Sequence, residues 1–237
     1  MMRVARAWRD ARFRLTATVV LVGAAVTPAD AQGRGAASFP RVEAGGGGGA
    51  AGAVGLADRD ANLLSNDTSG TAFRLFATAT ELHAAAAAEV RLGYRLSPRL
   101  TAEGRLTFSR PSLRVSISSD AEDAAPVEAT SGITEYVIEG GALWRLATET
   151  HRRWIPFVNG GAGLARHVHE DNVLAENGVS GYAGAGALYA IGAPRTPAAR
   201  HTGLRFDVRL QLLHGGIADG AGVSTRVVAT AGAFVAF

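Results

Sequence analysis

The feature that most constrains the fold of this chain is the strict two-residue alternation of its last segment, Val223–Phe237. One face of this segment carries Val227, Ala229, Ala231, Ala233, Val235 and Phe237. The opposite face carries Arg226, Val228, Thr230, Gly232, Phe234 and Ala236. Because successive side chains of an extended strand point to opposite sides, this pattern predicts a β-strand that separates two different environments.

The same alternation recurs along the chain and defines eight segments. We predict strands at Val42–Leu56, at a segment that begins within 72–83 and ends at Leu96, and at Leu100–Phe108, Ile133–Leu146, Trp154–Arg166, Val179–Ile191, Leu204–Leu212 and Val223–Phe237. Short turns at 97–99, 148–153 and 194–202 alternate with longer loops at 57–72, 109–131, 167–177 and 215–222. This even number of strands predicts an all-β fold, an eight-stranded antiparallel up-and-down transmembrane β-barrel with both ends on one side.

The start of the chain predicts export. Residues 1–31 carry five arginines, then the apolar run Leu15–Val26, then a small-x-small cleavage site at 29–31, as in a secretory signal peptide. The apolar run is shorter than the ~20 residues of a membrane-spanning helix, so an uncleaved anchor is only the alternative interpretation. The expected domains are the cleaved signal peptide 1–31, a periplasmic lead-in 32–41 and the barrel 42–237. The sequence has no cysteine, so neither a lipoprotein anchor nor a disulfide is expected.

The net charge of the chain comes mainly from the signal peptide. The whole chain is formally +3, with 24 Lys+Arg and 21 Asp+Glu, and its pI is about 9.9. Five of the basic and two of the acidic residues lie within 1–31, so the remainder balances at 19 of each sign. This balance removes the argument for a nucleic-acid partner that a basic pI would otherwise make.

Charged residues of both signs lie at mid-strand positions on the face opposite the apolar one. The candidates for ion pairs inside the barrel are Glu89, Arg91, Glu103, Arg105, Glu135, Glu139, Arg145, Arg205, Asp207, Arg209 and Arg226. An eight-stranded barrel is just wide enough for its own side chains, so opposite charges there are expected to pair and fill it. The alternative is a soluble barrel or sandwich in which the apolar faces point inward and the charges face water.

Three local patterns qualify this prediction. Four aromatic residues lie near the expected periplasmic strand ends, either by chance or as an interfacial girdle: Tyr94, Trp144, Trp154 and Phe237. The run Ala84–Ala88 favours a short helix by composition, although the flanking alternation favours a strand. The glycine run Gly45–Gly49 fixes strand register only weakly.

Two stretches carry a resemblance to a known family. Trp154–Gly163 is similar to a Pro-aromatic-apolar strand with spaced glycines, and Leu204–Leu210 is similar to an alternating penultimate strand. Residues 42–237 resemble in this way the small outer-membrane β-barrel family, which includes OmpA-like transmembrane domains and opacity-type surface proteins. The resemblance implies a place in the bacterial outer membrane, contact with its lipids, and recognition by the barrel-assembly machinery through a C-terminal signal that includes Val235 and Phe237. A peptidoglycan-binding domain, which the full OmpA type adds, is not expected.

Candidate chemistry is sparse. The most metal-like cluster is His167–Asp171, but a zinc site needs more ligands than this segment offers, so a solvated loop is expected. Asp58–Asn62 opens like a calcium loop, but Leu63 and Ser69 stand where that loop requires Gly and Glu. We therefore expect no metal, no cofactor and no catalytic residue.

The expected function is non-enzymatic, a structural or surface-contact role for an outer-membrane barrel with a salt-bridged lumen. One alternative is a narrow porin-like channel for small solutes, formed if the ion pairs part. A less favoured one is a lipid-modifying enzyme at the barrel rim, where His214 and Ser224 flank the last loop. Because small residues let two walls approach, Ala84, Ala86 and Ala88 raise the further hypothesis of a homo-oligomer.

Overall fold

The computed structural model describes residues 40–64, 72–118, 125–147, 153–169, 174–191, 201–217 and 222–237. The predicted signal peptide and the predicted lead-in, except for its last two residues, lie outside the described residues. Within these ranges, no helix is long and apolar enough to cross a membrane.

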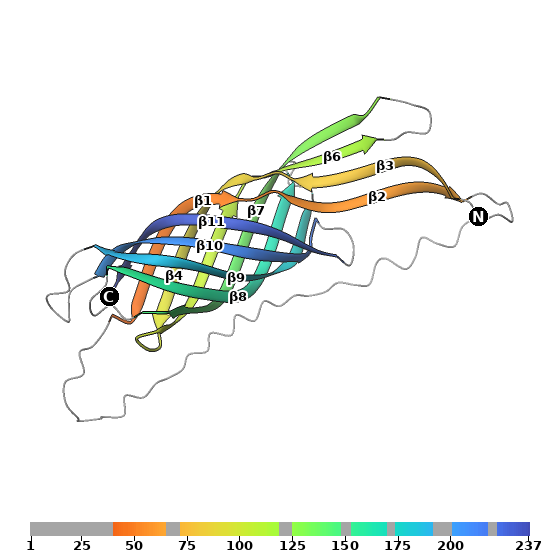
Figure 1. The fold of residues 1–237 in the computed structure, drawn as a ribbon. Helices are drawn as coiled ribbons and strands as arrows, with labels where there is room; N and C mark the ends of the chain where they lie inside the picture. The colour runs from red at the N-terminus through yellow and green to blue at the C-terminus, as the bar shows by residue number, and fades with distance from the viewer. Residues whose placement is uncertain are drawn as a thin grey trace, which may run out of the picture. The chain divides into compact units, whose positions relative to one another are not determined.

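Eight strands close into a ring (Figure 1). They are β1 (Val42–Ala51), β4 (Ala85–Arg95), β5 (Leu100–Ser109), β7 (Val127–Arg145), β8 (Trp154–His169), β9 (Ala175–Ile191), β10 (His201–Gly215) and β11 (Val223–Ala236). Each pairs antiparallel with its neighbours in chain order, and pairing of β1 with β11 closes the ring. The two ends of the ring's chain meet where the Arg41 amide donates to the Phe237 carbonyl oxygen at 2.8 Å. The prediction of an all-β, eight-stranded, up-and-down barrel is confirmed.

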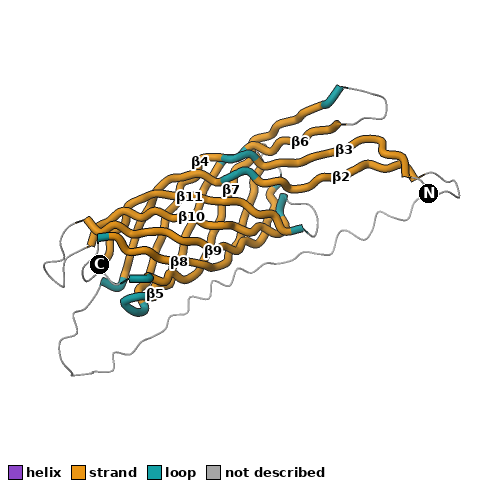
Figure 2. The backbone as a smooth tube through the Cα atoms, in the orientation of Figure 1, coloured by secondary structure: helices purple, strands orange, loops and turns teal. Residues whose placement is uncertain are grey.

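Three further strands continue past one end of the ring (Figure 2). β2 (Val54–Leu64), β3 (Ala72–Leu82) and β6 (Ser112–Ser118) form a sheet in the order β2-β3-β6-β7, in which β7 contributes residues 127–132. We call this sheet the extension, the end of the ring that bears it the extension end, and the other end the turn end.

The extension corrects the predicted loops at 57–72 and 109–131, which are largely β-strand where the structure describes them. Residues 125–131 are exposed, as are several positions of β2. A sheet that meets water on both faces has no apolar–polar alternation, so its sequence resembles that of a loop. The predicted loop at 167–177 is also shorter than expected, because β8 runs to His169 and β9 begins at Ala175.

The alternation changes phase where the extension leaves the ring. Two-residue alternation counted back from Leu96 predicts that Leu82 shares the outward face of the second segment, but its side chain is only 1% exposed, so that prediction is wrong. Leu82 packs against Val54 and Ile133 in an apolar cluster. The break between β3 and β4, at His83 and Ala84, turns the strand over, and a period-two pattern cannot show such a break.

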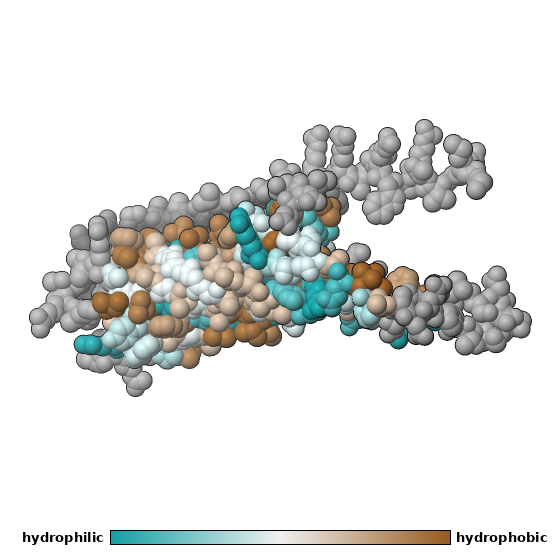
Figure 3. Space-filling view, turned by 90° about the horizontal axis from the view of Figure 1, so that it is seen from above, coloured by the Kyte–Doolittle hydropathy of each residue, from teal (hydrophilic) through white to brown (hydrophobic). Residues whose placement is uncertain are grey.

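Within the ring, apolar side chains face outward and charged ones face inward. Leu92, Ile138 and Val208 are 67%, 62% and 55% exposed, whereas Arg145 and Asp207 are 0% and 1% exposed. In Figure 3, brown and tan apolar residues are spread over the ring's wall, with paler residues between them. The alternative of a soluble barrel with an apolar interior is therefore wrong.

The two unusual stretches of sequence are both strands. The run at 84–88 lies mostly in β4 rather than in a helix, because its backbone pairs with β1 and β5, and these pairings override helix propensity. The glycine run is the middle of β1. A Cβ added to Gly47 would stand 2.2 Å from the Ala231 carbonyl oxygen, and one added to Gly49 would stand 1.9 Å from that of Ala229. Close approach to β11 thus requires glycine on the inward face of β1.

Replacing Gly47 by alanine should disrupt ring closure. The new methyl group would meet the backbone of β11, which cannot move as a flexible side chain can, so we expect a loss of stability of about 1–3 kcal/mol. The measurement is urea unfolding of the barrel in lipid vesicles. The matched control is Gly48→Ala, whose Cβ would lie at an ordinary 3.5 Å from the Ala87 carbonyl oxygen. Equal stability of the two variants would contradict this account.

The extension is crossed by exposed ion pairs, one between Arg74 and Asp60 at 2.5 Å and one between Arg114 and Glu128. The hydrogen bond from Arg114 lowers the pKa of Glu128 below its ordinary value. A depressed carboxyl pKa means that the contact stabilises the folded protein at neutral pH, and that this stabilisation is lost as the pH falls through that pKa.

We expect Arg114→Gln to raise the pKa of Glu128 in an NMR titration, because the hydrogen bond that lowers it is then removed. Arg110→Gln is the control and should leave the pKa of Glu128 unchanged. An unaltered pKa in R114Q would refute the contact.

Candidate functional site

The interior of the ring holds an almost balanced set of charges. Among the described residues, six carboxylates and seven guanidinium groups on the ring strands are buried. The carboxylates belong to Glu43, Glu89, Glu103, Glu135, Glu139 and Asp207. The guanidinium groups belong to Arg91, Arg95, Arg105, Arg145, Arg205, Arg209 and Arg226. Burial of so many charges is tolerable only if nearly all of them are paired.

Several of these pairs cross the lumen. Arg205 on β10 forms a two-point contact with Glu103 on β5, and Arg226 on β11 binds Glu135 on β7 at 2.5 and 3.0 Å. In the ring order β1-β4-β5-β7-β8-β9-β10-β11, each of these two pairs joins strands that lie opposite each other. Two-point guanidinium–carboxylate contacts are the strongest and most directional ion pairs in proteins. They therefore span the full width of the lumen.

Asp207 is the centre of the middle cluster. Its Oδ2 accepts from Arg205 at 2.7 Å and from the Asn159 amide at 2.8 Å, and Arg105 and Arg209 approach it at 3.9 and 4.0 Å. Arg209 also reaches across to Glu89 on β4, at 2.5 Å.

Two of these guanidinium groups also stack on aromatic rings. Arg105 lies 4.5 Å from the centre of the Tyr182 ring, and Arg205 lies 4.6 Å from that of Phe157. These contacts hold the guanidinium planes against the wall of the lumen.

A second cluster lies toward the extension end. Besides Arg226, Glu135 accepts from the Ser109 hydroxyl at 3.1 Å and contacts His167 Nε2 at 2.9 Å. Gln211 links this cluster to Glu139, because its Oε1 accepts from Arg226 while its amide donates to Glu139, both at 2.8 Å.

A third cluster lies at the turn end, where Glu43 contacts both Arg145 and Arg95, the latter at 2.7 Å. Arg145 also donates to the Thr101 hydroxyl at 2.7 Å. The three clusters together distribute ion pairs along the whole length of the lumen.

Apolar clusters complete the filling of the lumen. Leu143, Ile155, Phe157 and Leu188 are buried together with Phe234 packed on them, near the turn end. Val54, Leu82 and Ile133 lie at the extension end, with Ile217 from beyond β10 packed against them. Between the walls, a void of about 10 Å³ lined by Arg91, Glu103 and Arg205 has room for about one water molecule.

The structure buries all eleven residues that the sequence analysis assigned to the lumen, and ten of them have an oppositely charged partner. Glu139 differs, since its described partner is the neutral amide of Gln211.

Sequence reasoning missed several other members of the network: Glu43, Arg95, Asn159, His167 and Gln211. The glycines that follow Glu43 hide the alternation of β1. Arg95 and Gln211 stood on the charged face and could have been included on that ground.

His167 was expected in a solvated loop, and that expectation is wrong, because the side chain is 4% exposed and bound to Glu135. Among the described residues, no group of three or more His, Cys, Asp or Glu side chains could hold a metal ion. The rim pair of the enzyme hypothesis is not assembled: His214 Nδ1 lies 3.1 Å from the Gly222 carbonyl oxygen, and the Ser224 hydroxyl donates to that of Gly55.

Removing one partner of a cross-lumen pair should destabilise the barrel strongly. Arg226→Met leaves the Glu135 carboxylate buried without its main counter-charge, and we expect a cost of about 3–5 kcal/mol. The double variant Arg226→Met/Glu135→Leu should recover most of that loss, since neither charge of the pair then remains without the other. Arg99→Met, at an exposed turn, is the control in urea unfolding in vesicles. A single variant as stable as the control would rule out this role.

No family model matches the chain, and no curated protein matches it. Solved structures do. The crystal structure of neisserial surface protein A (NspA) is similar over 83% of this chain and 97% of its own, with 13% identity and a TM-score of 0.51. The outer membrane protein OprG from Pseudomonas aeruginosa gives 11% identity and a TM-score of 0.47, over 86% of this chain and 99% of its own. The outer membrane protease OmpT from Escherichia coli gives 10% identity and a TM-score of 0.38, over 83% of this chain and 97% of its own.

The likeness to NspA concerns the fold, because the identity is low. That the protein is non-enzymatic stays a prediction. The closed ring of eight antiparallel strands, with its apolar wall and charged interior, gives this chain the fold of the small outer-membrane β-barrel proteins.

Proposed function

We propose that the protein is a non-enzymatic barrel of the bacterial outer membrane, with a closed lumen, and that it acts through the surface that it presents outside the membrane. The observation that carries this proposal is the pairing of Arg205 with Glu103 and of Arg226 with Glu135 across opposite strands. A lumen filled in this way leaves the wall and the extension as the parts able to meet a partner.

The outer wall supports a place in a membrane. Its ring of aromatic residues at the turn end includes Tyr94, Trp144, Trp154 and Phe237, which are 43–54% exposed. Trp154 also packs on Tyr189, with ring centres 4.9 Å apart. Aromatic girdles of this kind mark the boundaries of the apolar band in transmembrane barrels. Outer-membrane lipids and the barrel-assembly machinery are accordingly its proposed partners.

The extension supports the surface-contact role. Ile117 on β6 and Val127 on β7 are directly opposed in the sheet and are 38% and 61% exposed. Val115 and Ala129 are also directly opposed, two positions along the same strands, and therefore lie on the same face. An exposed apolar patch on a sheet edged by charges is typical of a protein-contact surface.

Conductance tests the closed lumen. In planar bilayers we expect the wild type to be silent, because ion pairs and apolar clusters fill its lumen from end to end. Arg114→Ala/Glu128→Ala, which removes an ion pair from the extension and leaves the lumen unchanged, should be silent as well. Conductance of the wild type would refute the closed lumen and favour the narrow channel.

Adhesion tests the contact surface. Cells that expose the Ile117→Ser/Val127→Ser variant should aggregate and adhere to a protein-coated surface less than cells with the wild type, since the apolar patch is then removed. Arg114→Gln, on the opposite face of β6, is the matched control.

Cross-linking in outer-membrane fractions tests the proposed homo-oligomer, whose contact would be formed by the exposed Ala84, Ala86 and Ala88. Recovery of monomer alone would exclude this homo-oligomer.

A further inference from the structure

We infer that the outer wall at β5, β7 and β8 is a binding site for a membrane lipid with a phosphate-bearing headgroup. The inference rests on the proposed function, because it requires this wall to face lipid. Two hollows carry the argument. One, at the extension end, is lined by Arg110 and by hydroxyl side chains from β6 and β7. The other, lower on the wall, spans β1, β4, β5 and β7 and is lined largely by apolar side chains and glycine.

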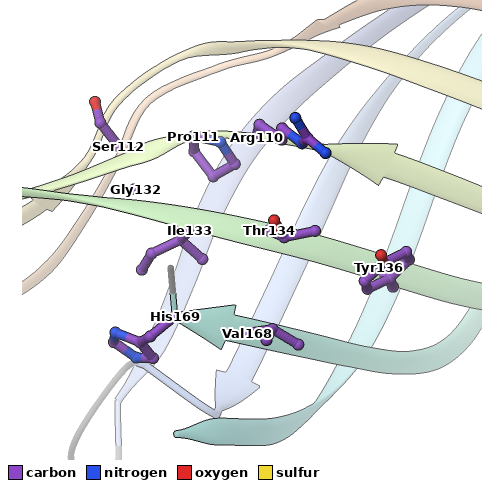
Figure 4. Close-up of a pocket in the computed structure, with 9 residues that line it drawn as sticks. All are labelled: Arg110, Pro111, Ser112, Gly132, Ile133, Thr134, Tyr136, Val168 and His169. Atoms are coloured by element: carbon purple, nitrogen blue, oxygen red, sulfur yellow. The ribbon is translucent and has the colours of Figure 1, made fainter. Parts of the chain in front are cut away.

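The upper hollow has a volume of about 660 Å³ and lies where the extension leaves the ring (Figure 4). Arg110 lies on one side, Thr134 and Tyr136 lie along β7, and His169 lies on the other side at the end of β8. Ser112 adds a third hydroxyl group. A guanidinium group with neighbouring hydroxyl donors is the side-chain set that binds phosphate oxygens.

Arg110 and Arg166 flank Tyr136 on the outer face. Arg166 is exposed and stands opposite Tyr136 in the β7–β8 pairing. Arg110 is exposed and lies 5.5 Å from the centre of the Phe108 ring, which in turn packs on Tyr136 at 5.4 Å. Neither arginine forms an ion pair with another of the described residues. Within the described ranges, these two cations beside an aromatic pair thus have no carboxylate that neutralises them.

These arginines lie at headgroup height. Tyr136 and Trp144 both point outward from β7, eight residues apart, which is about 26 Å along a strand and about 20 Å across the membrane for a strand tilted by ~40°. That span is close to the ~25 Å apolar band of a transmembrane barrel, which aromatic residues bound on both sides. Tyr136 therefore marks the upper boundary, and lipid phosphates lie just at or above it.

The wall below the arginines accommodates acyl chains. Leu106, Ile138 and Leu164 stand side by side in the pairing and are 39%, 62% and 52% exposed. In the next row down, Gly104 is paired with Gly140, and a Cβ added to either would meet no atom within 4 Å. The second hollow, of about 560 Å³, includes Gly104, Leu106 and Ile138 in its lining. A phosphate at Arg110 and Arg166 would place its chains over this row and into this hollow.

The test is native mass spectrometry of the protein in detergent micelles, with dioleoyl phosphatidic acid, dioleoyl phosphatidylcholine and inorganic phosphate as probes. We expect preferential binding of phosphatidic acid, weakened roughly tenfold in Arg110→Gln/Arg166→Gln, because each cation near a lipid phosphate contributes to affinity. Arg99→Gln, at the turn end, removes one exposed charge and should bind as the wild type does. Gly104→Leu, which fills the lower hollow, should weaken binding of the same lipid.

Each result decides the inference. Equal binding of phosphatidic acid by the double variant, the control and the wild type would overturn it. Competition by inorganic phosphate as effective as that by the lipid would also overturn it, in favour of a free-anion site. Every sample is checked for the heat-dependent gel mobility of a closed barrel, so failure of the proposed fold in the membrane is distinguished from failure of the lipid site.

Discussion

The structure depends on one constraint, which is that charges enclosed by an eight-stranded ring must find partners inside it. An interior of this size holds side chains and little water, so each buried guanidinium group needs a carboxylate within reach. Arg205 with Glu103 and Arg226 with Glu135 meet this need across the full width of the lumen. The same contacts tie opposite walls of the ring together, and the proposal of a closed lumen rests on them.

The outer wall follows the opposite rule. Its apolar side chains remain exposed, and glycine at positions such as Gly104 and Gly140 leaves shallow hollows between them. A wall of this kind is suited to lipid, and its upper hollow is lined by Arg110, in the link between β5 and β6. The extension then carries the β-structure beyond the ring, with apolar residues such as Ile117 open on one face. Interior and wall are thus the two faces of the ring strands, and the extension, which shares only β7 with the ring, is a third environment.

The candidate lumen site was largely predictable, because period-two alternation assigns a residue to a face whatever its partner is. Arg209 and Asp207 could be placed inside from their strand alone. Their partners could not, since contact between β10 and β4 depends on the curvature of the ring and on strand register. Glu43 was missed because the glycines after it carry no side chain with which to show a face, and His167 because its neighbours Glu170 and Asp171 are typical of a loop.

By itself, the sequence determined the fold class, the number of ring strands and which face of most strands is charged, because these depend only on local periodicity. Tertiary structure decided which charges pair, how far the strands continue into the extension and where the alternation turns over at Leu82 and Ala84. It also decided the upper hollow, whose lining includes Arg110, between β5 and β6, and His169, at the end of β8, although the two residues are far apart in the chain. These properties depend on strand pairing and closure, and no local pattern encodes them.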